Sequence, residues 1–300
     1  MYSLPKTRHR HLQVNGIRIF YRETVPADPE APVLLLLHGF PSASHQYRRL
    51  MDVLGAQSRM IALDYPGFGH SEAPKPASQG GSFVYSFDSL ADIVVGFVQQ
   101  LGLARFSLYV FDFGAPVGLR LATRMPERVA GLIVQNGNLY HEGLSEAASA
   151  FIALTPDDAG AISKVEDLLT LEMTRSQYEG GSADPERIAP DGWTLDQHFL
   201  DLPGRRQPQL DLAFDYKSNL AHYAEWQAWL RRHRPPTLIV WGKNDPFFVE
   251  AGARAILEDV PDARLHLFDT GHFALEECLP QIAPLIADFL RSAPERGKQR

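Results

Sequence analysis

An aspartate stands where the chain is expected to turn sharply from a strand into a helix. In LYVFDFGAPVGLRLA, Leu108 to Ala122, an apolar run typical of a buried strand precedes Asp112, and small residues follow it. The turn matches a nucleophile elbow, usually written G-x-S-x-G, except that Asp112 replaces the serine and Val110 the first glycine. A carboxylate at a helix N-terminus faces unpaired N–H groups and positive potential, which keep it ionised without a base. Asp112 is therefore predicted to attack a saturated carbon and form an alkyl-enzyme ester, with a purely structural N-cap as the alternative role.

Two further residues that suit such chemistry follow later predicted strands. His272, in FDTGHFALEE, is the candidate base that activates water once an ester exists. Asp245, in LIVWGKNDPFF, is the candidate acid that orients the imidazole, and the order nucleophile, acid, histidine supports this assignment. Asn136 also ends a predicted strand, but an amide supplies no charge. Asp269 shares a loop with His272 and is less suited to reach its ring from behind.

The turn HGFP, His38 to Pro41, follows the first long apolar run and supplies further candidates. The backbone N–H groups of Phe40 and Phe113 are expected to converge into an oxyanion hole. His38 is predicted to contact the substrate. The alternative is a glycine-proline turn without chemistry.

The elements that must position these residues alternate between strand and helix, which predicts a doubly wound, mostly parallel α/β sheet. Reactive groups in such sheets gather beyond the C-terminal ends of the strands. Asn15-Gly16 predicts a hairpin near the N-terminus. Strands are expected within 32–39, 59–69, 106–111, 129–135, 237–241 and 265–268, and helices over 46–54, 86–101, 115–124, 251–257 and 280–290.

The alternation stops near Asn138 and resumes after Arg234-Pro235-Pro236. Short helical segments and loops fill the interval, without a strand pattern. The sequence therefore predicts a core over residues 1–137 and 234–300, interrupted by a mostly helical cap over residues 138–233.

Composition narrows the class of protein. The 300 residues are 45% hydrophobic and carry a net charge of −7. A net negative charge does not favour binding to nucleic acid, which is itself negatively charged. The single Cys278 excludes an internal disulfide and fits a reducing compartment. The N-terminus lacks an apolar signal segment, and the longest apolar run, Val33 to Leu37, is too short to span a bilayer. We expect a cytoplasmic monomer or homodimer, without membrane, metal or cofactor.

Several motifs together resemble the α/β-hydrolase superfamily over nearly the whole chain. They are HGFP, DYPGFGHS, DFGAPVG, WGKND and DTGHFALEE, in the familiar order. The aspartate elbow makes the chain most similar to the branch that includes epoxide hydrolases and haloalkane dehalogenases. The resemblance implies Asp112 as nucleophile, Asp245 as acid and His272 as base, with a cap over a site for a small apolar electrophile.

The resemblance to dehalogenases is incomplete at two positions. Haloalkane dehalogenases hold the leaving halide with a Trp after the nucleophile and a second Trp or Asn, but here these positions are Phe113 and Phe40. A phenyl ring has no N–H to donate. Haloacetate dehalogenases carry an Arg after the nucleophile, which Phe113 also replaces.

Epoxide hydrolases use two cap tyrosines to protonate the opening oxygen, and a Tyr O–H can donate at neutral pH because its pKa is roughly 10. The segment FDYKSNLAHYAEW resembles the late cap segment that carries one of them, which points to Tyr216. Tyr178 or Tyr140 is expected to be the second tyrosine. The remaining tyrosine of the predicted cap is Tyr223.

Opening of epoxides to vicinal diols is therefore the predicted activity. Halide displacement by the same triad is the first alternative, and a non-catalytic small-molecule-binding protein with the same fold is the second. A serine esterase is excluded because no serine occupies the nucleophile position.

Overall fold

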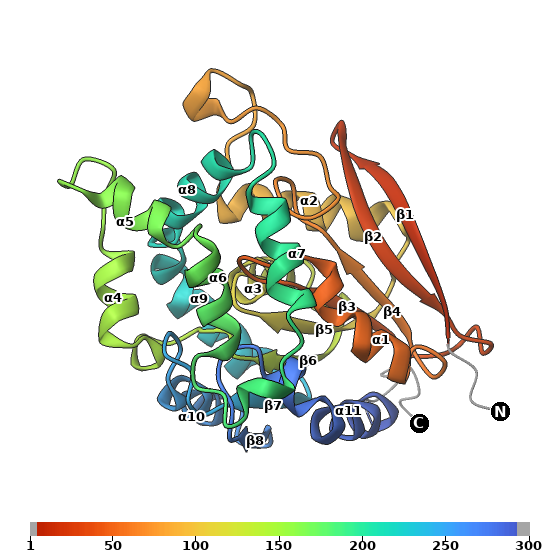
Figure 1. Cartoon of the computed structure of the whole chain (residues 1–300). Helices are drawn as coiled ribbons and strands as arrows, with labels where there is room; N and C mark the ends of the chain where they lie inside the picture. The colour runs from red at the N-terminus through yellow and green to blue at the C-terminus, as the bar shows by residue number, and fades with distance from the viewer. Residues whose placement is uncertain (1–4, 293–300) are drawn as a thin grey trace.

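Eight strands form one sheet in the computed structural model, which describes residues 5–292. Their order across the sheet is β1-β2-β4-β3-β5-β6-β7-β8; the pairs β1–β2 and β2–β4 are antiparallel and the others are parallel (Figure 1). The strands are β1 (Lys6–Val14), β2 (Ile17–Val25), β3 (Val33–Leu37), β4 (Arg59–Leu63), β5 (Phe106–Phe111), β6 (Val129–Gln135), β7 (Thr237–Gly242) and β8 (Arg264–Phe268). The predicted α/β fold is confirmed.

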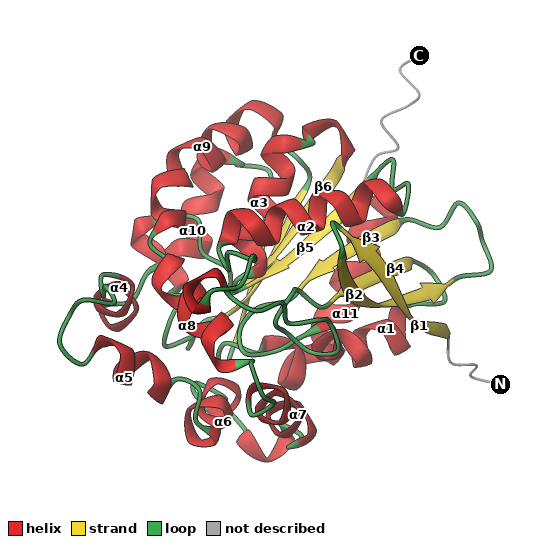
Figure 2. Cartoon of the chain, turned by 90° about the horizontal axis from the view of Figure 1, so that it is seen from above, coloured by secondary structure: helices red, strands yellow, loops and turns green. Residues whose placement is uncertain are grey.

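Helices cover both faces of this sheet, which explains the continuous apolar runs of its central strands. Every residue of β5 and β7 is buried. Figure 2 shows α2 (Phe87–Gln100) and α3 (Gly114–Arg124) on one face, with α1 (Arg48–Leu54) and α11 (Ala274–Ser292) on the other. Another core helix, α10 (Glu250–Asp259), connects β7 to β8. Two hydrophobic clusters, one on each side of the sheet, result from this layering.

Local sequence signals set several element ends. Asn15 and Gly16 adopt φ values of 50° and 81°, as the predicted hairpin turn requires. Ser86 caps α2 by accepting a hydrogen bond from the backbone N–H of Ser89 at 3.2 Å. The last helix begins at Ala274, earlier than the expected 280, because a short first segment joins it across a kink at Cys278.

The interval between β6 and β7 holds six α-helices and, within the described residues, no strand that joins the sheet. They are α4 (Glu146–Ile152), α5 (Ala161–Asp167), α6 (Leu171–Glu179), α7 (Asp191–Leu200), α8 (Arg206–Asp215) and α9 (Ser218–His233). Figure 1 shows α4, α5, α6 and α8 gathered away from the β1–β2 hairpin. The inserted helical cap is thus confirmed, while its boundaries at 138 and 233 stay a prediction.

The outer ends of the predicted core, residues 1–4 and 293–300, lie outside the described residues. Over residues 5–292, no helix combines the length and the apolar character needed to cross a membrane. The same residues contain no group of three or more His, Cys, Asp or Glu side chains placed to hold a metal ion.

Candidate active site

The predicted elbow is a tight turn between β5 and α3. Asp112 has φ 48°, a left-handed conformation that non-glycine residues seldom adopt. Two neighbouring glycines make the turn possible: a Cβ on Gly39 would come within 2.3 Å of the Asp112 Cβ, and one on Gly114 within 2.1 Å of the Leu37 carbonyl oxygen. Asp112 is only 8% exposed, so the turn presents its carboxylate within the protein.

Val110, which replaces the first glycine of the elbow motif, is accommodated by a glycine on the following helix. Its side chain is fully buried, and a Cβ on Gly118 would lie 2.5 Å from the Val110 Cγ1. The glycine at 118 therefore supplies the space that a glycine at 110 would otherwise leave.

The predicted acid, base and nucleophile meet beyond the C-terminal ends of β7, β8 and β5. The His272 Nδ1 lies 2.7 Å from the Asp245 Oδ2, and the His272 Nε2 lies 3.7 Å from the Asp112 Oδ2. All three side chains are buried. The structure thus brings together the three residues that sequence order placed in one constellation.

Asn136, whose amide carries no charge, binds Asp245 at the end of β6. Its Nδ2 donates to the Asp245 Oδ2 at 2.8 Å, and its Oδ1 accepts from the backbone N–H of Gly242 at 2.9 Å. The other Asp245 oxygen accepts from the backbone N–H groups of Phe247 and Phe248 at 2.8 and 3.1 Å. Asn136 therefore positions Asp245, which its place at the end of β6 alone does not reveal.

The N–H groups of Phe40 and Phe113, the predicted oxyanion-hole donors, both act on the Asp112 carboxylate. The Phe40 N–H donates to Asp112 Oδ1 at 2.6 Å, and the backbone N–H of Phe113 lowers the pKa of this carboxylate. Since Oδ1 is held in this way, Oδ2 is the oxygen that remains for a new bond.

At both Asp112 and His272, burial and nearby charges shift the pKa in opposite directions. Burial raises the pKa of Asp112 above its usual range, although the His272 ring and the two backbone N–H groups oppose the shift. Burial alone would lower the pKa of His272, but its charge attraction to and hydrogen bond with Asp245, with a further contribution from Asp112, raise it overall. An imidazolium between two carboxylates is therefore favoured, as expected for a base that takes a proton.

A cavity of about 250 Å³ opens above Asp112 and His272. The core contributes aromatic side chains to it, and the cap contributes an apolar wall from α4 and α5. The non-polar lining residues are Phe40, Phe113, Phe247, Phe248, Ala147, Ala148, Phe151, Ile152, Val165, Leu168, Leu169 and Ala213. Its remaining lining residues, Gln177, Gln209 and Tyr216, place three polar side chains of the cap within reach of a bound molecule.

Tyr216 is the only tyrosine among the described residues that line this cavity. Its ring lies 5.9 Å from that of Phe113 and 5.5 Å from that of Phe87, measured between centroids. Burial first, then the charges of Tyr223, Asp112 and Asp245, raise the pKa of Tyr216 well above its ordinary value. Its hydroxyl therefore stays protonated at neutral pH.

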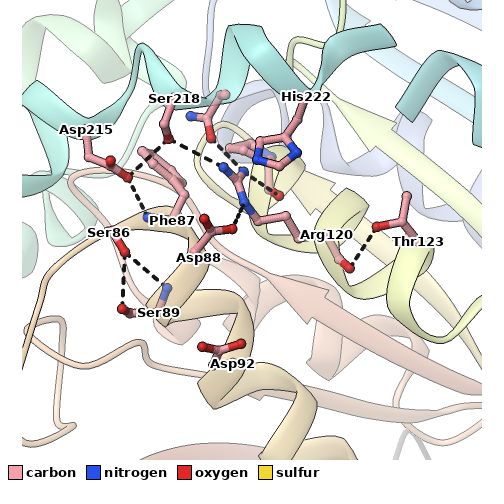
Figure 3. Close-up of polar contacts among 12 residues, drawn as sticks. Ser86, Phe87, Asp88, Ser89, Asp92, Arg120, Thr123, Asp215, Ser218 and His222 are labelled. Carbon is pink, nitrogen blue, oxygen red and sulfur yellow. Dashed lines mark hydrogen bonds and ion pairs between the residues drawn. The ribbon is translucent and has the colours of Figure 1, made fainter. Parts of the chain in front are cut away.

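The segment that carries Tyr216 is tied to the core helices on both sides. Figure 3 shows Asp215 bonded to the backbone N–H of Phe87, and Arg120 on α3 directed toward Ser218. The bond between Asp215 and Phe87 is 2.8 Å long. Arg120 also donates to Asn219 at 2.6 Å. Because α3 starts at the elbow, these contacts fix Tyr216 relative to Asp112.

The structure corrects the two predictions for a second tyrosine. Tyr140 donates its hydroxyl to the Asp259 Oδ2 at 2.6 Å, and Tyr178 donates to the Asp196 Oδ2 at 2.5 Å. Neither side chain lines the cavity. Both hydroxyls are engaged by carboxylates, so neither is directed at a substrate.

The prediction that His38 contacts the substrate is also corrected. Its ring is fully buried and does not line the cavity, and the Nε2 accepts from the backbone N–H of Tyr65 at 3.2 Å. The Nδ1 therefore carries the proton and donates to the Gly39 carbonyl at 3.0 Å. Burial lowers the pKa of His38 to about 4, so that a neutral histidine braces the HGFP turn.

A profile described as alpha/beta hydrolase fold matches residues 32–278, and the chain therefore belongs to this family. It is 37% identical to an uncharacterized hydrolase of Saccharomyces cerevisiae, over 92% of this chain and 94% of the relative.

Two further relatives carry more specific names. A haloalkane dehalogenase of Mycolicibacterium paratuberculosis is 30% identical over 91% of this chain and 87% of the relative. Epoxide hydrolase 2 of Caenorhabditis elegans is 23% identical over 93% of this chain and 78% of the relative. Among solved structures, a haloalkane dehalogenase from Bradyrhizobium elkani superposes with a TM-score of 0.78 at 21% identity, covering 96% of this chain and 99% of that one. This last likeness shows the fold.

Proposed function

We propose that the chain hydrolyses epoxides to vicinal diols through a covalent ester on Asp112. The observation that carries this proposal is the Tyr216 hydroxyl in the same cavity as Asp112 and His272. An epoxide needs a proton donor for its opening oxygen, and a protonated tyrosine supplies one at neutral pH.

In the first step, the Asp112 Oδ2 forms a bond to a ring carbon of the epoxide, and the carbon–oxygen bond of the ring breaks. Tyr216 gives its proton to the released oxygen. The Oδ1, held by the Phe40 N–H at 2.6 Å, becomes the carbonyl oxygen of the ester.

In the second step, His272 takes a proton from water, and the resulting hydroxide attacks the Asp112 Cγ. The N–H groups of Phe40 and Phe113 stabilise the negative charge that develops on Oδ1. Collapse of this intermediate releases the diol and restores the carboxylate. Asp245 stabilises the imidazolium across the 2.7 Å contact with Nδ1.

Dehalogenation is the second candidate, because a relative at 30% identity bears the name haloalkane dehalogenase. The side chains of Phe40 and Phe113 weigh against it, since neither ring carries an N–H for the leaving halide. The same ester on Asp112 would form, but the leaving group would be a halide ion and would need no proton.

The test is turnover of styrene oxide and 1-bromobutane in parallel, with diol and bromide measured separately. The proposal expects diol and little bromide. Bromide release without diol would favour dehalogenation, and the absence of both products and of any Asp112 adduct would favour a binding protein.

A further inference from the structure

One amide in the cavity has an N–H2 group that nothing in the described chain uses. Gln177 on α6 is 5% exposed and lines the cavity with Asp112, Tyr216 and His272. Its Nε2 is buried, and over residues 5–292 it has no hydrogen-bond partner. Buried N–H groups are nearly always paired in folded proteins, so an unpaired one in a cavity points to a ligand.

The helix that carries Gln177, α6, packs against the loop that carries His272. The helix ends against the loop that carries His272: a Cβ on Gly271 would come within 1.8 Å of the Gly180 carbonyl oxygen. Tyr178, the neighbour of Gln177, stacks on Phe273 with ring centroids 3.8 Å apart. Gln177 thus lies near the residues that contact Gly271 and Phe273, the two neighbours of His272 in the chain.

A second glutamine, Gln209, lines the same cavity but differs from Gln177 in which amide atom is unpaired. Gln209 on α8 is 2% exposed, and its Nε2 donates to the Gly67 carbonyl at 3.2 Å. This bond fixes its amide, so the unpaired atom is the acceptor Oε1. An acceptor cannot stabilise an oxygen that gains negative charge, whereas the N–H2 of Gln177 can.

We propose that Gln177 donates a hydrogen bond to the epoxide oxygen as the ring opens, beside the Tyr216 hydroxyl. This inference rests on the proposed epoxide hydrolysis and assigns the second donor to an amide instead of a tyrosine. When Asp112 Oδ2 bonds to the ring carbon, the electron pair of the broken bond stays on the ring oxygen. Tyr216 transfers its proton to that oxygen, and Gln177 keeps both of its protons throughout.

The proton balance then closes in the second step. Water gives one proton to His272 and its hydroxide to the Asp112 Cγ. The bond between Cγ and the substrate oxygen then breaks, and this oxygen takes the proton of the added hydroxide, which releases the diol and restores the Asp112 carboxylate. The Tyr216 phenolate regains a proton by way of solvent as His272 loses one. The net reaction is epoxide plus water to diol, and Gln177 acts only on the first step.

The test separates the two steps in Gln177→Met, which keeps the length of the side chain and removes the donor. Single-turnover mixing with styrene oxide, followed by acid quench and mass spectrometry of the Asp112 peptide, gives the rates of ester formation and ester loss. We expect ester formation to slow by about tenfold to a hundredfold, while ester loss stays unchanged. Slower ester loss with unchanged formation, or no change in either, would overturn the assignment.

Gln177→Glu supplies a readout that a packing role would not move. An ionised glutamate cannot donate, but a protonated one can. Ester formation relative to wild type should therefore recover as the pH falls, and Gln177→His should restore part of the rate at neutral pH. A pH-independent ratio in Gln177→Glu would contradict the proposal. Failure of wild type to form any adduct would instead remove the epoxide reaction itself.

Discussion

The floor and the roof of the cavity are built differently. On the floor, supplied by the core, the Asp245 carboxylate accepts from His272, Asn136, Phe247 and Phe248. On the roof, supplied by the cap, the wall from α4 and α5 is apolar, and the amides of Gln177 and Gln209 each have an unpaired atom. Under the proposed function, the core carries the nucleophile and the base, while the cap supplies the apolar wall that contacts the substrate and the donors for ring opening.

Turnover should be almost abolished when the proposed nucleophile on the floor is removed. Asp112→Ala deletes the only carboxylate lining the cavity among the described residues, so we expect turnover to fall by on the order of 10⁴-fold or more. Diol formation from styrene oxide measures this. Substantial residual turnover would mean that water attacks the epoxide directly.

The roof should contribute to the first step through Tyr216. Tyr216→Phe removes the proton donor, and ester formation is expected to slow by on the order of a hundredfold. Tyr140→Phe is the matched control, because the Tyr140 hydroxyl bonds Asp259 away from the cavity. It should leave ester formation unchanged and lower the free energy of unfolding by about 1–3 kcal/mol. Equal effects of the two substitutions on ester formation would deny Tyr216 a special role.

The floor also sets the pH dependence of the second step. Ester loss requires a neutral His272. Asp112 is esterified at this stage and carries no charge, so Asp245 is the carboxylate that raises the pKa of His272, and the rate should rise with pH through the pKa that Asp245 sets. Asp245→Asn removes the largest upward contribution, so the inflection should move to lower pH and the plateau should fall by roughly a hundredfold or more. An inflection at an unchanged pH would show that Asp245 does not raise the pKa of His272.

Substitutions in the apolar wall of the roof should change substrate preference, with smaller effects on rate than the substitutions above. Phe151→Ala on α4 enlarges the apolar wall, and we expect the KM for styrene oxide to rise roughly tenfold while a bulkier epoxide is favoured. Val110→Ala, under the elbow, should instead lower the free energy of unfolding by about 1–3 kcal/mol. Thermal unfolding and KM for both variants compare the two regions. A large effect of Val110→Ala on KM, with an effect of Phe151→Ala on stability alone, would contradict the proposed difference between floor and roof.

Sequence patterns predicted the floor well because its residues follow strands directly. An apolar run that ends in a turn places the next polar side chain at one edge of the sheet, which is how Asp112, Asp245 and His272 came together. The supporting role of Asn136 escaped prediction, since hydrogen bonding to Asp245 depends on a loop 109 positions away in the chain.

The roof was harder to predict, for a physical reason. Whether a cap tyrosine faces a substrate depends on partners distant in sequence: Asp259 engages Tyr140 over a separation of 119 residues. Tyr178 has its own partner in Asp196. Gln177 carried no sequence signal, because an amide on a short helix is common and only the cavity reveals its unpaired N–H2.

The ester on Asp112 is the central claim, and His272→Gln tests it most directly. This variant should still open styrene oxide but should not hydrolyse the ester, because no base remains to activate water. Mass spectrometry of the peptide that contains Asp112 should show it heavier by the mass of one epoxide, with the adduct accumulating to about one per chain. An unmodified Asp112 in this variant, alongside wild-type enzyme that produces diol, would contradict the account.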